Sequence, residues 1–165
     1  MIRSMLYATD LGVYAPFVMQ HALALARTFN AELYVIHAVE PMGQFAESLL
    51  QSYLDEQTLD ELHSEGVNTV MANIEQRVLE NIREELGEAA DLAVIKNVRV
   101  RQGDPAQVIL DQAQRLAVDL LIFGSHSQGA GVDVPLGRTA VRLLQLSPVP
   151  VYMVPLAQHL GRRKS

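Results

Sequence analysis

The chain has 165 residues, of which 49% are apolar, and a formal net charge of −6. This length suits one domain of ordinary size, and the apolar content supports a core without disulfide or metal cross-links. The absence of cysteine excludes thiol nucleophiles, thiolate metal sites and iron–sulfur clusters. The negative charge disfavours nucleic acid, and the aromatic residues are not interleaved with basic ones as a base-stacking surface requires.

The sequence carries no recognisable targeting or membrane segment. Met1–Ser4 leads directly into a strand-like run, without the apolar stretch and cleavage site of a secretory signal. No apolar run reaches the ~20 residues that span a bilayer. We therefore expect a cytoplasmic protein without membrane contact, with a single domain over residues 1–157 and a basic tail over residues 158–165.

The first part of the chain predicts a strand, a helix and a second strand. Ile2–Thr9 has the length and apolar content of a strand, and Glu32–Val39 is rich in β-forming residues and stops before Pro41. Between these strands, apolar residues recur at steps of three and four, which predicts a helix over Ala15–Phe29. This apolar stripe consists of Val18, Ala22, Leu25 and Phe29.

The segment between Met42 and Leu86 has helical character, with Gly66 as a break or kink. Its second half carries an apolar stripe of Val70, Ile74, Val78, Ile82 and Leu86. The role of the whole Met42–Gly66 stretch stays open. Within it, Gln44–Ser64 fits an exposed helix, a lid or a surface for a partner protein.

The second part of the chain repeats the alternation of strand and helix. Val94–Arg101 predicts a third strand, after which Gly103–Pro105 supplies a turn, an N-cap carboxylate and a proline for a helix that runs to about Leu116. Asp119–Gly124 is an almost continuous apolar run, which is typical of a central strand buried on both faces. A helix over Leu136–Leu146 and a last strand over Val149–Val154 follow, and Pro150 indicates that the last strand either lies at an edge or pairs in an unusual way.

This order of elements predicts the α/β class, with a five-stranded parallel sheet, right-handed crossovers and helices on both faces. Ligands of such sheets bind beyond the carboxyl ends of the strands, where the strand order reverses. The functional positions are therefore expected at Asp10, at Ala38–Glu40 and in the loop after Phe123.

The glycine- and serine-rich loop Gly124–Gly131, together with Gly137–Thr139 at the start of a helix, fits a phosphate-binding site. Small residues let backbone N–H groups approach a phosphate, and a helix N-terminus adds partial positive charge. The alternative is a plain strand-to-helix turn that needs glycine for its backbone geometry. The loop lacks the lysine of nucleoside triphosphatases and the later glycine of dinucleotide-binding proteins.

Other reactive residues give no catalytic or metal-binding pattern. Ser125, His126 and Ser127 are neighbours on one loop without a nucleophile elbow, which disfavours hydrolytic catalysis. The histidines are too scattered for a helical metal site, and His37, within a strand, suits a hydrogen-bonded core or cleft histidine. Asp10 suits either a contact to a base or sugar, or a cap on the following loop.

Several segments together resemble the universal stress protein family, over essentially the whole chain. These segments are Tyr7–Asp10, Val35–Ala38, Gly103–Ala106, Asp119–His126 and Ser147–Val151. The resemblance implies an adenine nucleotide alpha hydrolase-like, Rossmann-like sheet of order 3-2-1-4-5. It also implies a homodimer formed through the last strand, Val149–Val154, and a regulatory role in stress responses.

Family members that bind ATP share a pattern of Gly, two residues, Gly, nine residues, then Gly followed by Ser or Thr. In this chain the pattern falls on Gly124, Ser127, Gly137 and Arg138, so its spacing is kept while two of its residues are replaced. The resemblance implies a nucleotide site made of Ala8, Thr9, Asp10, Ala38, Phe123, Gly124, Ser125, Ser127, Gly137, Arg138 and Thr139. Arg138 either pairs with a phosphate or fills the pocket.

The leading hypothesis is a non-enzymatic regulatory protein that binds ATP, with or without Mg²⁺, or AMP, and acts on an unidentified protein partner. The alternative is a nucleotide-free dimeric interaction module whose cleft is blocked by Arg138. A third hypothesis is slow hydrolysis of ATP near Asp10 and His126, although nothing in the sequence positions a water molecule there.

Overall fold

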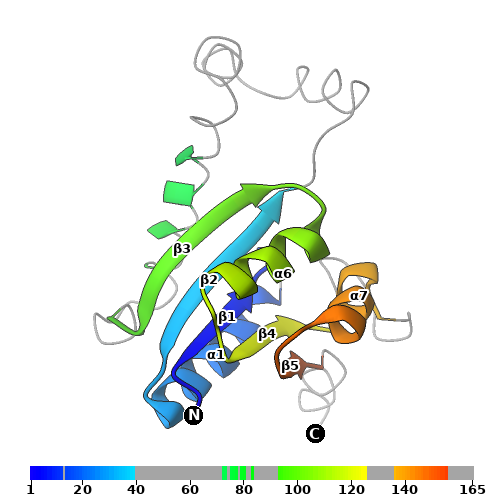
Figure 1. The fold of residues 1–165 in the computed structure, drawn as a ribbon. Helices are drawn as coiled ribbons and strands as arrows, with labels where there is room; N and C mark the ends of the chain where they lie inside the picture. The colour runs from blue at the N-terminus through cyan, green and yellow to red at the C-terminus, as the bar shows by residue number, and fades with distance from the viewer. Residues whose placement is uncertain are drawn as a thin grey trace, which may run out of the picture.

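Strands and helices alternate along the chain. The strands form one sheet, and helices cover both of its faces (Figure 1). The computed structural model describes residues 1–12, 14–39, 72–73, 75–77, 79–80, 83, 93–125 and 136–155. The strands are β1 (Ser4–Ala8), β2 (Glu32–Val39), β3 (Ile95–Gln102), β4 (Leu120–Gly124) and β5 (Val151–Val154). The helices described in full are α1 (Ala15–Phe29), α6 (Pro105–Arg115) and α7 (Arg138–Leu146).

The strands lie in the order β3-β2-β1-β4-β5, and all the pairings are parallel. The predicted α/β class and the implied strand order are thus confirmed. β4 has a strand on each side, as its apolar run predicts, and β1 is the middle strand, as the implied order requires. β5 lies at one edge of the described sheet, which is one of the two arrangements that Pro150 indicates.

The element boundaries follow local sequence signals. α1 and β2 have the predicted bounds, and Asn30 ends α1 in the left-handed conformation with φ of 51°. β5 begins at Val151 instead of the predicted Val149. Pro150 has no N–H to donate to a neighbouring strand, but its carbonyl accepts a hydrogen bond from the N–H of Leu121 at 3.0 Å.

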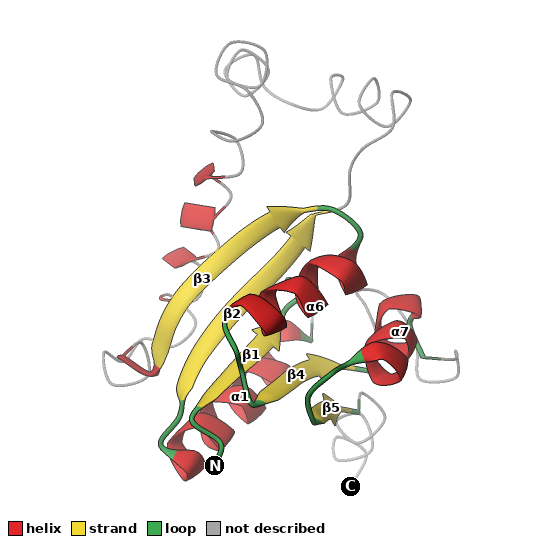
Figure 2. Cartoon of the chain, viewed as in Figure 1, coloured by secondary structure: helices red, strands yellow, loops and turns green. Residues whose placement is uncertain are grey.

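Side chains of β1 alternate between two apolar layers. Met5 and Tyr7 pack with residues of α1, whereas Leu6 and Ala8 pack with residues of α6 and α7. Figure 2 shows α6 and α7 on the near side of the sheet and α1 on its far side. Burial on both faces explains why β1 and β4 read as continuous apolar runs.

The segment from Met42 to Leu86 is described only in part. Its described residues, from 72 to 83, are helical, as predicted, and Leu79 packs against the apolar layer that contains α1. The Gln44–Ser64 half, Gly66 and the predicted apolar stripe lie outside the described residues, as does the basic tail. None of the described helices has the length and apolar content needed to cross a membrane.

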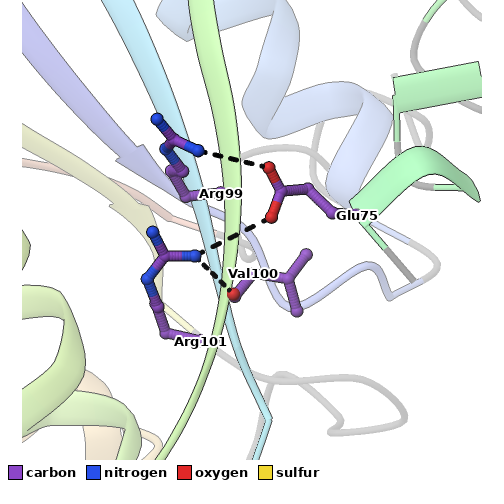
Figure 3. Close-up of polar contacts among 4 residues, drawn as sticks. All are labelled: Glu75, Arg99, Val100 and Arg101. Carbon is purple, nitrogen blue, oxygen red and sulfur yellow. Dashed lines mark hydrogen bonds and ion pairs between the residues drawn. The ribbon is translucent and has the colours of Figure 1, made fainter. Parts of the chain in front are cut away.

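Two arginines of β3 share one carboxylate of the neighbouring helical segment (Figure 3). The oxygens of Glu75 lie 3.6 Å from Nη1 of Arg99 and 3.7 Å from Nη1 of Arg101. The same Nη1 of Arg101 donates a hydrogen bond to the carbonyl of Val100 at 2.9 Å. Exposed ion pairs of this kind typically contribute about 0–1 kcal/mol, so this cluster orients the segment more than it stabilises the fold.

The carboxylate of Asp119 joins the start of β4 to the start of β1. Its Oδ2 accepts hydrogen bonds from the N–H of Arg3 at 2.9 Å and the N–H of Ser4 at 3.2 Å. The hydrogen bond from Arg3, and then that from Ser4, lowers the pKa of Asp119 below its ordinary value of 3.8. Since the folded state favours the ionised carboxylate, Asp119 stabilises the fold at pH values above 3.8.

We predict that Asp119→Asn is less stable than the wild type at neutral pH, and that this difference shrinks in acid. The stabilisation is lost as the pH falls below 3.8 and through the lowered pKa, because both proteins then carry an uncharged side chain. Urea unfolding of both proteins at pH 7, 5, 4 and 3 measures the difference. A difference that stays constant over this range would contradict the assignment.

Gly103, between β3 and α6, occupies a backbone conformation that only glycine adopts readily. Its φ is +151°, and its N–H donates to the carbonyl of Val39 at 2.9 Å. An added Cβ would lie 2.7 Å from Cγ2 of Val108. Strain and steric overlap therefore both oppose any side chain at this turn.

We predict that Gly103→Ala lowers the free energy of unfolding by about 1–3 kcal/mol, the usual cost of a residue forced into a sparsely populated conformation. Chemical unfolding measures this loss. Gln107→Ala, at an exposed position of α6, is the matched control and is expected to change stability by less than about 0.5 kcal/mol. Equal stability of Gly103→Ala and the wild type would show that the turn relaxes without cost.

Candidate functional site

A cleft of about 530 Å³ opens at the carboxyl ends of the strands. Its walls come from the ends of β1, β2 and β4 and from the first turns of α1, α6 and α7. The volume lies within the range of about 300–1,000 Å³ that is usual for small-molecule sites. The cleft lies where the strand order reverses, with β2 on one side of β1 and β4 on the other.

All the predicted site residues that the structure describes line this cleft. They are Ala8, Thr9, Asp10, Ala38, Phe123, Gly124, Ser125, Gly137, Arg138 and Thr139. Ser127 and His126 lie outside the described residues. Segments far apart in the sequence thus meet at one place, because the carboxyl ends of parallel strands share one edge of the sheet.

The cleft also has walls that the sequence analysis did not assign to the site. Tyr14, Ala15 and Val18 come from the start of α1, and Pro105 and Ile109 come from the start of α6. A helix that follows a parallel strand begins at the same edge where the strand ends. The first turns of the predicted helices were therefore the signal that could have found these residues.

The turn after β1 is held by side chains of its own residues. Oγ1 of Thr9 accepts a hydrogen bond from the N–H of Leu11 at 3.0 Å, and Oδ1 of Asp10 accepts one from the N–H of Gly12 at 2.8 Å. Leu11 has φ of 59°, an unusual value for a bulky residue. Asp10 therefore caps the loop, which was one of its two predicted roles, and its exposed carboxylate also lines the cleft.

His37 connects β2 to this turn. Its Nδ1 lies 2.9 Å from the carbonyl oxygen of Thr9. Because a carbonyl only accepts hydrogen bonds, Nδ1 carries the proton. His37 is half-buried and lines the cleft, in agreement with the prediction of a hydrogen-bonded cleft histidine.

The start of α6 is capped as predicted. Oδ2 of Asp104 accepts hydrogen bonds from the N–H of Gln107 at 3.1 Å and from Nη1 of Arg142 at 2.7 Å. Pro105 occupies the first turn, where its missing N–H costs nothing. Asp104 thus accepts a hydrogen bond from a free N–H group at the N-terminus of α6 and links this helix to α7.

At the N-terminus of α7, in contrast, no side chain of the described residues forms a cap. Gly137 is the N-cap residue, and the first turn contains no acidic residue. The N–H of Val141 donates to the carbonyl of Gly137 at 3.0 Å, so the N–H groups of Arg138, Thr139 and Ala140 precede the first intrahelical hydrogen bond. These N–H groups, the helix dipole and the Arg138 guanidinium make this end of the cleft attractive to an anion.

Ser125 holds this anion-attracting corner in place. It is only 3% exposed, and its carbonyl accepts a hydrogen bond from the N–H of Gly137 at 3.3 Å. Its own N–H donates to the carbonyl of Val154 at 2.9 Å. The end of β4 is therefore connected both to the start of α7 and to the end of β5.

Apolar side chains form other parts of the cleft wall. Val18, Ile109, Phe123 and Leu143 are all buried and all line it. An apolar surface that meets a cationic corner suits an amphipathic ligand with a flat apolar part and an anionic part. A phosphorylated nucleoside has this combination.

The comparisons with known proteins agree with this architecture. The model of the universal stress protein family matches residues 1–155. The chain is 28% identical to the universal stress protein YxiE of Bacillus subtilis over 155 residues, which cover 93% of this chain and 99% of YxiE. The chain belongs to the universal stress protein family, as its resemblance implied.

Solved structures show the same fold. The hypothetical protein MJ0577 superposes with a TM-score of 0.66 at 24% identity, covering 94% of this chain and 96% of MJ0577. A universal stress protein in complex with cAMP superposes with a TM-score of 0.56 at 16% identity, covering 93% of this chain and 97% of that protein. At these identities the similarity establishes the fold of the chain and leaves its ligand to be derived from its own residues.

Proposed function

We propose that this protein is a non-enzymatic regulator of stress responses in the cytoplasm that binds ATP or a related adenine nucleotide. The observation that carries the proposal is the N-terminus of α7, which no described side chain caps, with Arg138 at its first position, at one end of a cleft of about 530 Å³. The cAMP complex of a structural neighbour adds support, since that protein holds an adenine nucleotide on the same fold.

In the proposed arrangement, the adenine and ribose lie against Asp10, Ala38 and Phe123. The phosphates lie against the corner made by Ser125, Ser127, Gly137, Arg138 and Thr139. AMP fits the same arrangement with fewer phosphate contacts. No residue is assigned a catalytic role, because binding alone shifts the protein toward its ligand-bound conformation.

The competing hypothesis is that Arg138 blocks the cleft and that the protein acts only as an interaction module. The cleft keeps its volume of about 530 Å³ with Arg138 in its wall. Arg138 is also exposed rather than buried among the lining residues. Both observations favour a guanidinium that pairs with a phosphate over one that fills the pocket.

We predict that nucleotide-stripped protein binds ATP with micromolar affinity and that Gly137→Val weakens binding at least tenfold. Gly137 has φ of −58° and ψ of 151°, which valine adopts without strain, so the substitution adds bulk at the phosphate corner without forcing the backbone. Isothermal titration calorimetry measures both affinities. Gln145→Val, at an exposed position of α7 outside the cleft, is the matched control and should bind like the wild type.

Two outcomes of this titration would reject the proposal that the protein is a nucleotide sensor, that is, a regulator that binds an adenine nucleotide in this cleft. Binding that appears only after Arg138→Ser would support the blocked interaction module. No binding by either protein to ATP, ADP or AMP would reject adenine nucleotides as ligands of the cleft.

We also propose that the protein forms a homodimer through Val149–Val154, the segment that contains β5. β5 is an edge strand of the described sheet, and its residues Val151, Tyr152 and Met153 are only half-buried. The carbonyls of Pro150 and Val154 accept hydrogen bonds from Leu121 in β4 and from Ser125 just after it. The alternation of a strand therefore turns the backbone groups of Val151 and Met153 outward. Outward N–H and C=O groups on an edge strand are suited to pairing with a second copy.

We predict that the wild-type protein sediments as a dimer at micromolar concentration and that Met153→Pro weakens the dimer at least tenfold. Proline at this position removes an outward N–H while leaving the hydrogen bonds between β4 and β5 in place. Analytical ultracentrifugation measures the association, and circular dichroism checks that the variant is folded. A wild-type protein that remains monomeric at 100 micromolar, on the order of the concentrations used in such experiments, would reject this interface.

A further inference from the structure

Ionisable side chains are few in the described lining of the cleft. They include one guanidinium, that of Arg138, one carboxylate, that of Asp10, and one imidazole, that of His37. Arg138 is the first residue of α7, Asp10 follows β1, and His37 belongs to β2. The positive charge is thus at the α7 end of the cleft and the negative charge at the β1 end.

Arg138 differs in its contacts from Arg142, the next arginine along α7. Nη1 of Arg142 lies 2.7 Å from Oδ2 of Asp104, so its charge is compensated by an acidic neighbour. Within the part of the chain that the structure describes, no such ion pair is formed by Arg138. Its charge, together with about half a unit charge from the helix N-terminus, faces the ligand site without a compensating anion in the first turn of α7.

The Asp10 carboxylate already has a structural function. Its Oδ1 accepts the hydrogen bond from Gly12 that shapes the turn after β1. A Mg²⁺ ion in a nucleotide site is usually held by one or two protein carboxylates, by phosphate oxygens and by water. In the described lining Asp10 is the one carboxylate, and one of its two oxygens is already engaged by the turn, so the cleft offers a metal ion few protein ligands.

A divalent cation on the phosphates would also lie close to the Arg138 guanidinium. The two positive charges would repel one another in a cleft that is partly shielded from water. Metal-free phosphates, which carry more negative charge than their magnesium complex, would instead pair with Arg138 and with the N–H groups of α7. The local charges therefore favour the nucleotide without its metal.

On this basis we propose that the cleft binds the metal-free nucleotide, with Arg138 supplying the positive charge that Mg²⁺ would otherwise provide. This inference rests on the proposed binding of an adenine nucleotide. It goes beyond that proposal because it assigns the ionic form of the ligand and the residue that selects it.

The test is calorimetric titration of nucleotide-stripped protein with ATP, once in excess EDTA and once in excess Mg²⁺. We expect wild-type protein to bind ATP in EDTA at least as tightly as in Mg²⁺. Arg138→Ser should lose at least tenfold in affinity in EDTA and recover most of this loss when Mg²⁺ is added. Arg142→Ser, which removes the same charge from the same helix outside the cleft, should keep the wild-type response to Mg²⁺.

The outcomes separate this inference from the proposed function. Wild-type binding that requires Mg²⁺ would overturn the inference and leave the nucleotide sensor intact. An equal loss of affinity in Arg138→Ser and Arg142→Ser would also overturn it, because a general charge effect would then explain the result. Failure of the wild type to bind in either buffer would reject both the inference and the proposed function.

Discussion

The parallel pairing of β1 with both β2 and β4 is the constraint on which the rest of the structure depends. Ser4–Ala8 pairs with Glu32–Ile36 on one side, and Met5–Tyr7 pairs with Leu120–Ile122 on the other. The chain therefore builds outward from β1 in two directions, and the connections that follow β1 and β4 diverge. The cleft occupies the space between these connections, so its position follows from the strand order before any ligand is considered. At the opposite ends of these strands, Asp119 reinforces the pairing, because its carboxylate accepts hydrogen bonds from the N–H groups of Arg3 and Ser4.

Strong local signals were sufficient to predict the strands, the parallel sheet and the edge at which the cleft lies, whereas the strand order and the full set of site residues came from the resemblance to the universal stress protein family. Continuous apolar runs marked the buried strands, and Gly103–Pro105 marked the capped start of α6. Two kinds of information were missing. The start of β5 at Val151 depended on how Pro150 contacts β4, through its carbonyl alone, and a contact between strands cannot be predicted from local sequence. The apolar walls at Tyr14 and Ile109 depended on how helices begin at the sheet edge, and residue type alone does not reveal this geometry.

Arg138, one of the two replaced residues of the phosphate pattern, changes the electrostatics of this helix terminus. Where the pattern of ATP-binding family members has a hydroxyl, this chain has Arg138, while Gly137 keeps the N-cap position of α7. A hydroxyl offers a neutral hydrogen bond and leaves charge neutralisation to a metal ion. A guanidinium offers both a planar set of donors and a full charge. The same helix terminus is therefore expected to select a different ionic form of the same nucleotide.

The hydrogen bonds of Ser125 give the proposed sensor a physical route from ligand to partner. Its carbonyl accepts from Gly137, at the phosphate corner, and its N–H donates to Val154, at the end of the edge strand. A ligand that draws the first turn of α7 toward itself would act on the peptide groups that flank Ser125. Because Ser125 is buried, it has little freedom to absorb such a displacement without passing it to β5. In the proposed sensor, the backbone of Ser125 would thus link the occupied cleft to the proposed dimer edge without a catalytic step.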